Sequence, residues 1–153
     1  MKNLWKNKKM WRWVLLAAIG VTTLIIWGLS LRPAGMSSQQ SDKLAVPLIN
    51  ATEAKGDFFD QLFVFVRKMA HFIEFFGLGL LWGLYRRQRP VRGVLCYGLL
   101  VAVIDEALQY ITPGRAPGLW DVALDYCGYF CGFALVFAVA DWCARRKLRQ
   151  QKK

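Results

Sequence analysis

The sequence contains few of the residues that build disulfide frameworks or zinc sites. Among its 153 residues are one histidine and four cysteines, which are Cys96, Cys127, Cys131 and Cys143. No two cysteines form a C-x-x-C pair, and none stands at ligand spacing from the histidine. Cys127 and Cys131 lie one helical turn apart, which favours packing over a bridge or a metal. The sequence therefore argues against a disulfide scaffold, and we assign no residues to a metal site from it.

Polar residues are too scarce in four long stretches for these to belong to a soluble domain. Hydrophobic residues make up 56% of the chain, and the runs at 13–31, 62–85, 93–111 and 121–142 lack a periodic polar face. Each run is long enough to cross a bilayer as a helix. The first run resembles a signal peptide, but its length and the poor cleavage site after it favour a retained helix. We predict an all-α, four-helix transmembrane bundle at 13–142, without a second domain.

Acidic residues are nearly absent from the segments predicted to lie on one side of the membrane. Of the 21 Lys and Arg residues, 15 lie in 2–12, 86–92 and 145–153, whereas nine of the ten acids, all but Asp141, fall on the opposite side. The positive-inside rule then places the basic tails 1–12 and 143–153 in the cytoplasm, an N-in/C-in topology with a polar outer loop at 32–60. Topology thus explains the net charge of +11, so we expect membrane lipids as partners and no nucleic acid.

Charged and polar residues nevertheless interrupt three of the four hydrophobic segments. A charge at the centre of a membrane helix costs roughly 2.5–3.5 kcal/mol, so such residues need one another or a wet cavity. In the predicted orientation all of them lie toward the outer surface, where we expect one polar pocket. Its members are Lys68, His71 and Glu74 in the second segment, Asp105, Glu106 and Gln109 in the third, Arg115 in the following turn, and Asp121 and Asp125 in the fourth.

Some of these residues also have a purely structural interpretation. Asp121 could cap the helix that follows it, Lys68 could extend to the membrane interface, and His71 could be a packed, hydrogen-bonded histidine. Asp105 and Glu106 are harder to explain in this way, because they lie near a helix C-terminus, where negative charge is unfavourable. Both carboxylates need partners from other segments.

The balance of charge in the predicted pocket is negative. Five carboxylates face two permanently charged cations, Lys68 and Arg115, and the titratable His71. Some of the acids therefore stay protonated unless a cation, a polar ligand or water is present. We hypothesise that one carboxylate among Asp105, Glu106 and Asp125 works as an acid or base. Arg67 either joins this set or points at lipid head groups.

Three ordered motifs on separate predicted helices carry a family resemblance. They are Lys68-x-x-His71-x-x-Glu74-Phe75, then Asp105-Glu106-x-x-Gln109 followed by Pro113-Gly114-Arg115, and Asp121-x-x-x-Asp125-x-x-Gly128-x-x-x-Gly132. With them, residues 66–140 resemble the VanZ-like family of bacterial membrane proteins. Phe75 stands where members often carry Tyr, and Asp125 where Asn is also common. The resemblance implies a multi-pass protein of the bacterial cytoplasmic membrane, in a family named after a member associated with teicoplanin resistance.

We expect the outer pocket to bind or modify a lipid-linked or other cell-envelope ligand, with a glycopeptide ligand as a further alternative. Catalytic roles are assigned to His71, Glu74, Asp105, Glu106 and Asp125, and ligand-binding roles to Lys68, Gln109, Arg115 and Asp121. Proton or small-solute handling and a non-catalytic envelope scaffold stay open as other functions. A divalent ion on His71 and the carboxylates is also compatible with the sequence, but no spacing selects one. The sequence specifies neither a cofactor, nor a reaction, nor the oligomeric state.

Overall fold

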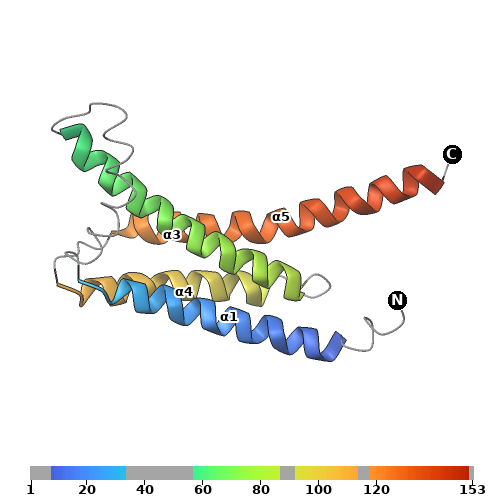
Figure 1. Ribbon diagram of the computed structural model, residues 1–153, viewed down its shortest axis with the longest axis horizontal. Coiled ribbons are helices and arrows are strands. Elements are labelled where there is room, and N and C mark those ends of the chain that lie inside the picture. The colour runs from blue at the N-terminus through green and yellow to red at the C-terminus, as the bar shows by residue number, and fades with distance from the viewer. Residues whose placement is uncertain (1–7, 34–56, 87–91, 114–117, 152–153) are drawn as a thin grey trace.

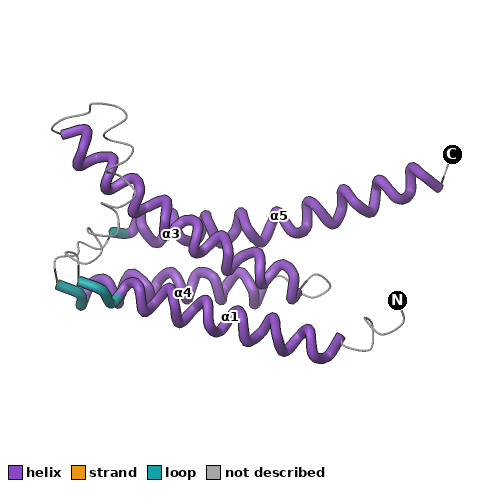
Figure 2. The backbone as a smooth tube through the Cα atoms, viewed as in Figure 1, coloured by secondary structure: helices purple, strands orange, loops and turns teal. Residues whose placement is uncertain are grey.

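The computed structural model describes residues 8–33, 57–86, 92–113 and 118–151, and every regular element in these ranges is a helix (Figure 2). The helices are α1 (Lys8–Ser30), α3 (Asp57–Arg86), α4 (Arg92–Tyr110) and α5 (Leu119–Gln151). The predicted all-α, four-helix architecture is confirmed. Most of the predicted polar outer loop (34–56), the turn at 87–91, residues 1–7 of the N-terminal tail and residues 152–153 of the C-terminal tail lie outside the described residues.

Three helices are longer than the hydrophobic runs that predicted them. Helix α1 begins at Lys8 and not at residue 13. Helix α3 begins at Asp57 and not at residue 62, and α5 ends at Gln151 and not at residue 142. The added end of α5 consists mainly of Ala, Arg, Lys, Leu and Gln, which are strong helix formers without being apolar. The hydrophobic run predicts only the apolar part of α5. The helix continues to Gln151 because the residues that follow have high helix propensity.

Three of the described helices, α1, α4 and α5, are long and apolar enough to cross a membrane. Helix α3 has sufficient length, but Arg67, Lys68, His71 and Glu74 interrupt its apolar sequence. That all four helices span a bilayer stays a prediction. The polar residues of α3 are those from which the pocket was predicted.

The helices run lengthwise through an elongated bundle, with both chain ends at the same extremity (Figure 1). Helix α3 packs most extensively on α5, and α1 packs on both α3 and α4. The core between them contains Ile26 of α1, Phe75 and Leu78 of α3, Val101 of α4 and Tyr129 of α5. The C-terminal part of α5 extends away from the other helices (Figure 1), and its residues beyond Asp141 are exposed.

Glycines set the spacing of α3 and α5. A Cβ atom at Gly79 would collide with the Tyr129 carbonyl oxygen, and one at Gly128 would stand 2.5 Å from the carbonyl oxygen of Phe72. Gly132 meets α3 in the same way one turn further along. Small residues at such spacing let helix backbones approach closely. The close packing predicted from these glycines is confirmed, and it brings the backbones of α3 and α5 into contact.

Candidate functional site

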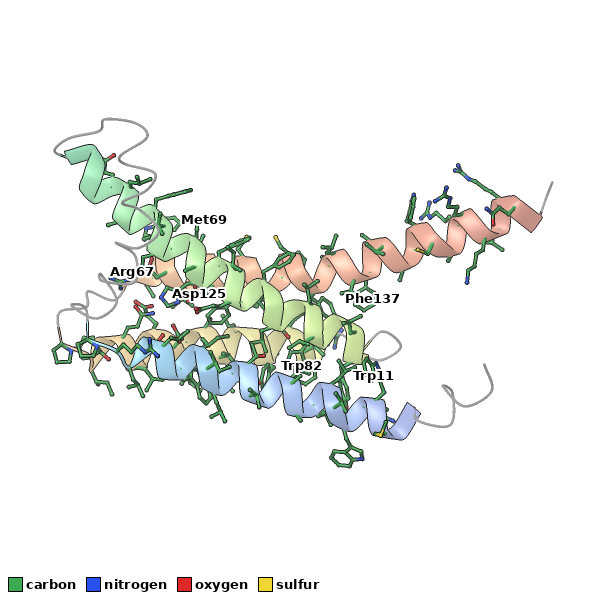
Figure 3. The ribbon with its side chains drawn as sticks, viewed as in Figure 1. Trp11, Arg67, Met69, Trp82, Asp125 and Phe137 are labelled. Atoms are coloured by element: carbon green, nitrogen blue, oxygen red, sulfur yellow. The ribbon has the colours of Figure 1, made fainter. Side chains whose placement is uncertain are left out.

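A cavity of about 310 Å³ lies between α3, α4 and α5. Figure 3 places Arg67 and Asp125 toward the end of the bundle opposite the chain ends, far from Trp11. The cavity is lined by Val64, Arg67, Lys68 and His71 of α3, Gln109 of α4, and Asp121, Leu124 and Asp125 of α5. Five of the predicted site residues therefore share one cavity wall.

Asp105 is fully buried and is held on both oxygens. Ser30, the last residue of α1, donates its hydroxyl to Oδ1 at 2.6 Å, and the amide of Gln109 donates to Oδ2 at 2.9 Å. The side-chain oxygen of Gln109, Oε1, accepts a long hydrogen bond of 3.5 Å from Nη2 of Arg67. A carboxylate buried at this depth needs such donors, because an unpaired buried charge is costly. The helices α1, α3 and α4 are thereby joined through one acid.

Lys68 and Asp121 form an ion pair in the cavity wall. The Lys68 ammonium lies 2.6 Å from Asp121 Oδ1, and both side chains are partly exposed. Asp121 stands in the first turn of α5, where a carboxylate is also favoured by the free N–H groups. Asp121 therefore lies at the start of a helix, as predicted, and also has a partner on α3. Lys68 pairs with this acid, so its side chain does more than extend to the membrane interface.

His71 and Asp125 meet deeper in the cavity. One ring nitrogen of His71 and one carboxylate oxygen each of Asp105 and Asp125 lie within 4.8 Å of one another. Nδ1 of His71 lies 3.6 Å from Glu74 Oε2, one turn further along α3. Asp125 is only 1% exposed, and its Oδ2 has no hydrogen-bond partner among the described residues. Three helices thus place an acid, a base and a second acid around one point.

Glu106 is buried beside this cluster and does not line the cavity. Its Oε1 accepts a short hydrogen bond from the backbone N–H of Gly118, just before α5 begins. Its Oε2 is buried without a hydrogen-bond partner in the described part of the chain. The position of Glu106 indicates that it holds the start of α5 against α4.

Eight of the nine predicted site residues lie among the described residues, and all eight belong to this end of the bundle. Arg115, the ninth, lies outside the described residues. Neither Ser30 nor Arg67 was assigned to the site from the sequence. The signal for Ser30 was a hydroxyl at the end of an apolar helix. The signal for Arg67 was its position next to Lys68. Helical spacing alone does not decide whether Arg67 points into the pocket or toward lipid head groups.

A family model described as VanZ/LLP1 matches residues 13–140, most of the chain. The chain belongs to this family. Neither the curated proteins nor the solved structures include one that matches it. The match begins at the start of the apolar part of α1, whereas the motifs that predicted the family begin in α3. The first helix is thus part of the VanZ unit, in agreement with the contact between Ser30 and Asp105.

The chemistry of the VanZ site follows from its inventory of charges. Five carboxylates and two cations, Arg67 and Lys68, gather with His71 in the described part of this end of the bundle. Lys68 neutralises Asp121, while Arg67 reaches the cavity through a long contact with Gln109. The cavity wall therefore carries the carboxylates of Asp121 and Asp125 and the guanidinium of Arg67, so it can contact ligand groups of either charge.

Proposed function

We propose that this VanZ-family membrane protein binds the polar head group of a membrane lipid or lipid-linked envelope molecule in the cavity between α3, α4 and α5. The observation that carries the proposal is a cavity with charged walls within a bundle of apolar, membrane-length helices. Its volume of about 310 Å³ is at the lower end of the range for small-molecule pockets. That size suits a head group whose acyl tail stays in the bilayer.

The surroundings of the cavity support a ligand with an apolar tail. Val64 lines the cavity and is itself half exposed, and Leu119 and Trp120 stand exposed beside Asp121 at the start of α5. Trp is characteristic of the membrane–water interface. A head group in the cavity would place its tail along these apolar side chains.

The charges favour a head group that carries a phosphate together with an amine or hydroxyl groups. The Arg67 guanidinium can donate two parallel hydrogen bonds to a phosphate. Asp125, with its unpartnered Oδ2, can accept from an amine or hydroxyl group. His71 stands beside that carboxylate and can transfer a proton if the bound group reacts.

The orientation that we propose places this end of the bundle at the outer face of a bacterial cytoplasmic membrane. Described basic residues such as Arg12, Arg92 and Arg145 belong to the opposite end, where both chain ends lie (Figure 1). Positive residues are retained on the cytoplasmic side. A link to teicoplanin-type resistance would then act through a lipid-linked envelope molecule, since the cavity is too small to enclose a large glycopeptide.

Retention of lipid by the purified protein tests the proposal. Wild-type protein in nanodiscs that contain phosphatidylethanolamine is transferred to detergent, and native mass spectrometry counts the lipids that stay bound. We expect Arg67→Gln and Asp125→Asn to lose the retained lipid. Arg145→Gln and Asp141→Asn are matched controls, because this exposed pair lies at the far end of α5 and undergoes the same chemical changes.

Equal retention by the site variants and their controls would contradict the proposal. The same four variants, expressed in a teicoplanin-sensitive bacterium, test the finer link to resistance. We expect protection by wild-type protein and both controls, and no protection by Arg67→Gln or Asp125→Asn. A proton pathway is not proposed, because the core below the cluster is mainly apolar, with Phe75, Leu78 and Val101 fully buried.

A further inference from the structure

Two residues of the cavity wall, His71 and Asp125, lie close to the buried Asp105, and together they offer the kinds of atom that bind metals. His71 of α3, Asp105 of α4 and Asp125 of α5 each offer one ligand atom, and these atoms lie within 4.8 Å of one another. Neighbouring oxygen or nitrogen ligands of one ion, each at about 2.0–2.2 Å from it, stand about 3.0–3.5 Å apart. Side-chain movements of up to about 1 Å, within the range of small changes in side-chain torsion angles, would therefore close the cluster around an ion.

The hydrogen bonds around the cluster leave coordinating atoms available. Ser30 and Gln109 each donate one hydrogen bond to Asp105, so both of its oxygens keep a lone pair. One ring nitrogen of His71 belongs to the cluster, and its Nδ1 lies 3.6 Å from Oε2 of Glu74. Metal ligands in proteins are commonly oriented by such outer partners, with the second ring nitrogen of a histidine directed at a carboxylate.

Asp125 provides an independent indication that something binds here. Its side chain is 99% buried, it lines the cavity, and its Oδ2 has no hydrogen-bond partner among the described residues. A buried carboxylate oxygen without a donor is costly unless the group is neutralised or coordinates a cation. Among the described residues, no lysine or arginine forms an ion pair with Asp125; Lys68 pairs with Asp121, and Arg67 contacts Gln109.

We propose that His71, Asp105 and Asp125 bind one divalent transition-metal ion such as Mn²⁺ or Zn²⁺. Imidazole selects for transition metals over Mg²⁺ and Ca²⁺, and two carboxylates favour the harder members of that series. Three protein ligands leave coordination positions open, and these would face the cavity. The ion offsets the negative charge of the buried acids.

The inference deepens the proposed function, because the open positions would accept a phosphate or hydroxyl oxygen of the head group. It does not depend on that function, since the three ligands all come from the chain itself. Metal binding without added lipid therefore tests the inference alone. Arg67→Gln should lose lipid and keep the metal, which separates a failure of one proposal from a failure of the other.

The test uses the full-length protein, purified in detergent with a tag free of histidine, stripped with EDTA and loaded with Mn²⁺. Mn²⁺ is chosen because the exposed thiols of Cys127 and Cys131 would bind the softer Zn²⁺. Elemental analysis after gel filtration should find about one Mn²⁺ per chain. Pulsed EPR should detect ¹⁴N coupling, which His71 alone can supply as the single histidine of the chain.

Three variants decide the result. His71→Gln and Asp125→Asn should weaken Mn²⁺ binding by at least about tenfold, and His71→Gln should abolish the ¹⁴N signal. Asp141→Asn, the same change on an exposed acid at the far end of α5, should bind as wild type. Mn²⁺ should raise the midpoint of thermal unfolding of wild type and Asp141→Asn but not of Asp125→Asn, whose own midpoint without metal shows that it folds.

Three results would overturn the inference. They are the absence of stoichiometric Mn²⁺ in wild-type protein, Mn²⁺ bound without ¹⁴N coupling, and Mn²⁺ bound equally by folded Asp125→Asn. The last two would place the ion on other groups of the chain.

Discussion

The contact between α3 and α5 predicts a sharp difference between two glycines that stand two residues apart. Replacing Gly79 by Ala puts a methyl group against the Tyr129 carbonyl oxygen and 2.9 Å from the Phe133 nitrogen, whereas a Cβ at Gly77 meets nothing within 4 Å. Ordinary contact begins at 3.4 Å, so the Phe133 nitrogen alone requires the helices to separate by about 0.5 Å. The obstacle is backbone, which no rotamer change can remove.

The expected cost of Gly79→Ala follows from a comparison with Gly77→Ala. Both substitutions gain about 0.8–1 kcal/mol of helix propensity, so their difference is the steric cost, typically about 1–3 kcal/mol for overpacking. At about 2–4 °C per kcal/mol for a chain of this length, Gly79→Ala should unfold about 2–12 °C below Gly77→Ala. Thermal unfolding in detergent, followed by intrinsic tryptophan fluorescence, measures both variants. Equal midpoints would refute the close approach of α3 and α5.

Two further substitutions test how single hydrogen bonds join the helices. Ser30→Ala removes the donor to Asp105 Oδ1 and should cost about 1.5–3 kcal/mol, as expected for a hydrogen bond to a charged group; unchanged stability in chemical unfolding would show that α1 does not hold this acid. Tyr129→Phe removes the buried 2.7 Å hydrogen bond to the Val94 carbonyl and should cost about 0.5–1.5 kcal/mol by the same measurement. A more stable Phe variant would count against this link between α4 and α5.

Much of the fold was predictable because the bilayer imposes a simple rule on sequence. A predominantly apolar run of about 20 residues needs a helix to satisfy its backbone in a bilayer, and four such runs predicted the four helices. The rule is silent on where a helix ends outside the membrane. Helix α5 accordingly continues to Gln151 through residues that are polar and strongly helix-forming.

The gathering of the site was predictable for a related reason, whereas its individual pairings were not. Ionisable residues in apolar helices must find one another, and His71, Asp105 and Asp125 do meet. Which acid pairs with which donor depends on helix rotation and side-chain rotamers, and sequence spacing alone does not specify these. Ser30 was therefore missed, and Arg67 could not be assigned a direction.

The geometry of the cluster depends on packing that contains no charge. The backbone contact of Gly128 with Phe72 lies one residue from His71 and three residues from Asp125. The distance between imidazole and carboxylate is thus set by a glycine that lets two backbones touch, and a larger residue there would move both groups apart. Ser30 fixes the third member, Asp105, from α1. The glycines of α5 and the polar cluster look like separate features of the sequence, but they depend on each other. Close packing at Gly128 holds His71 and Asp125 near one another.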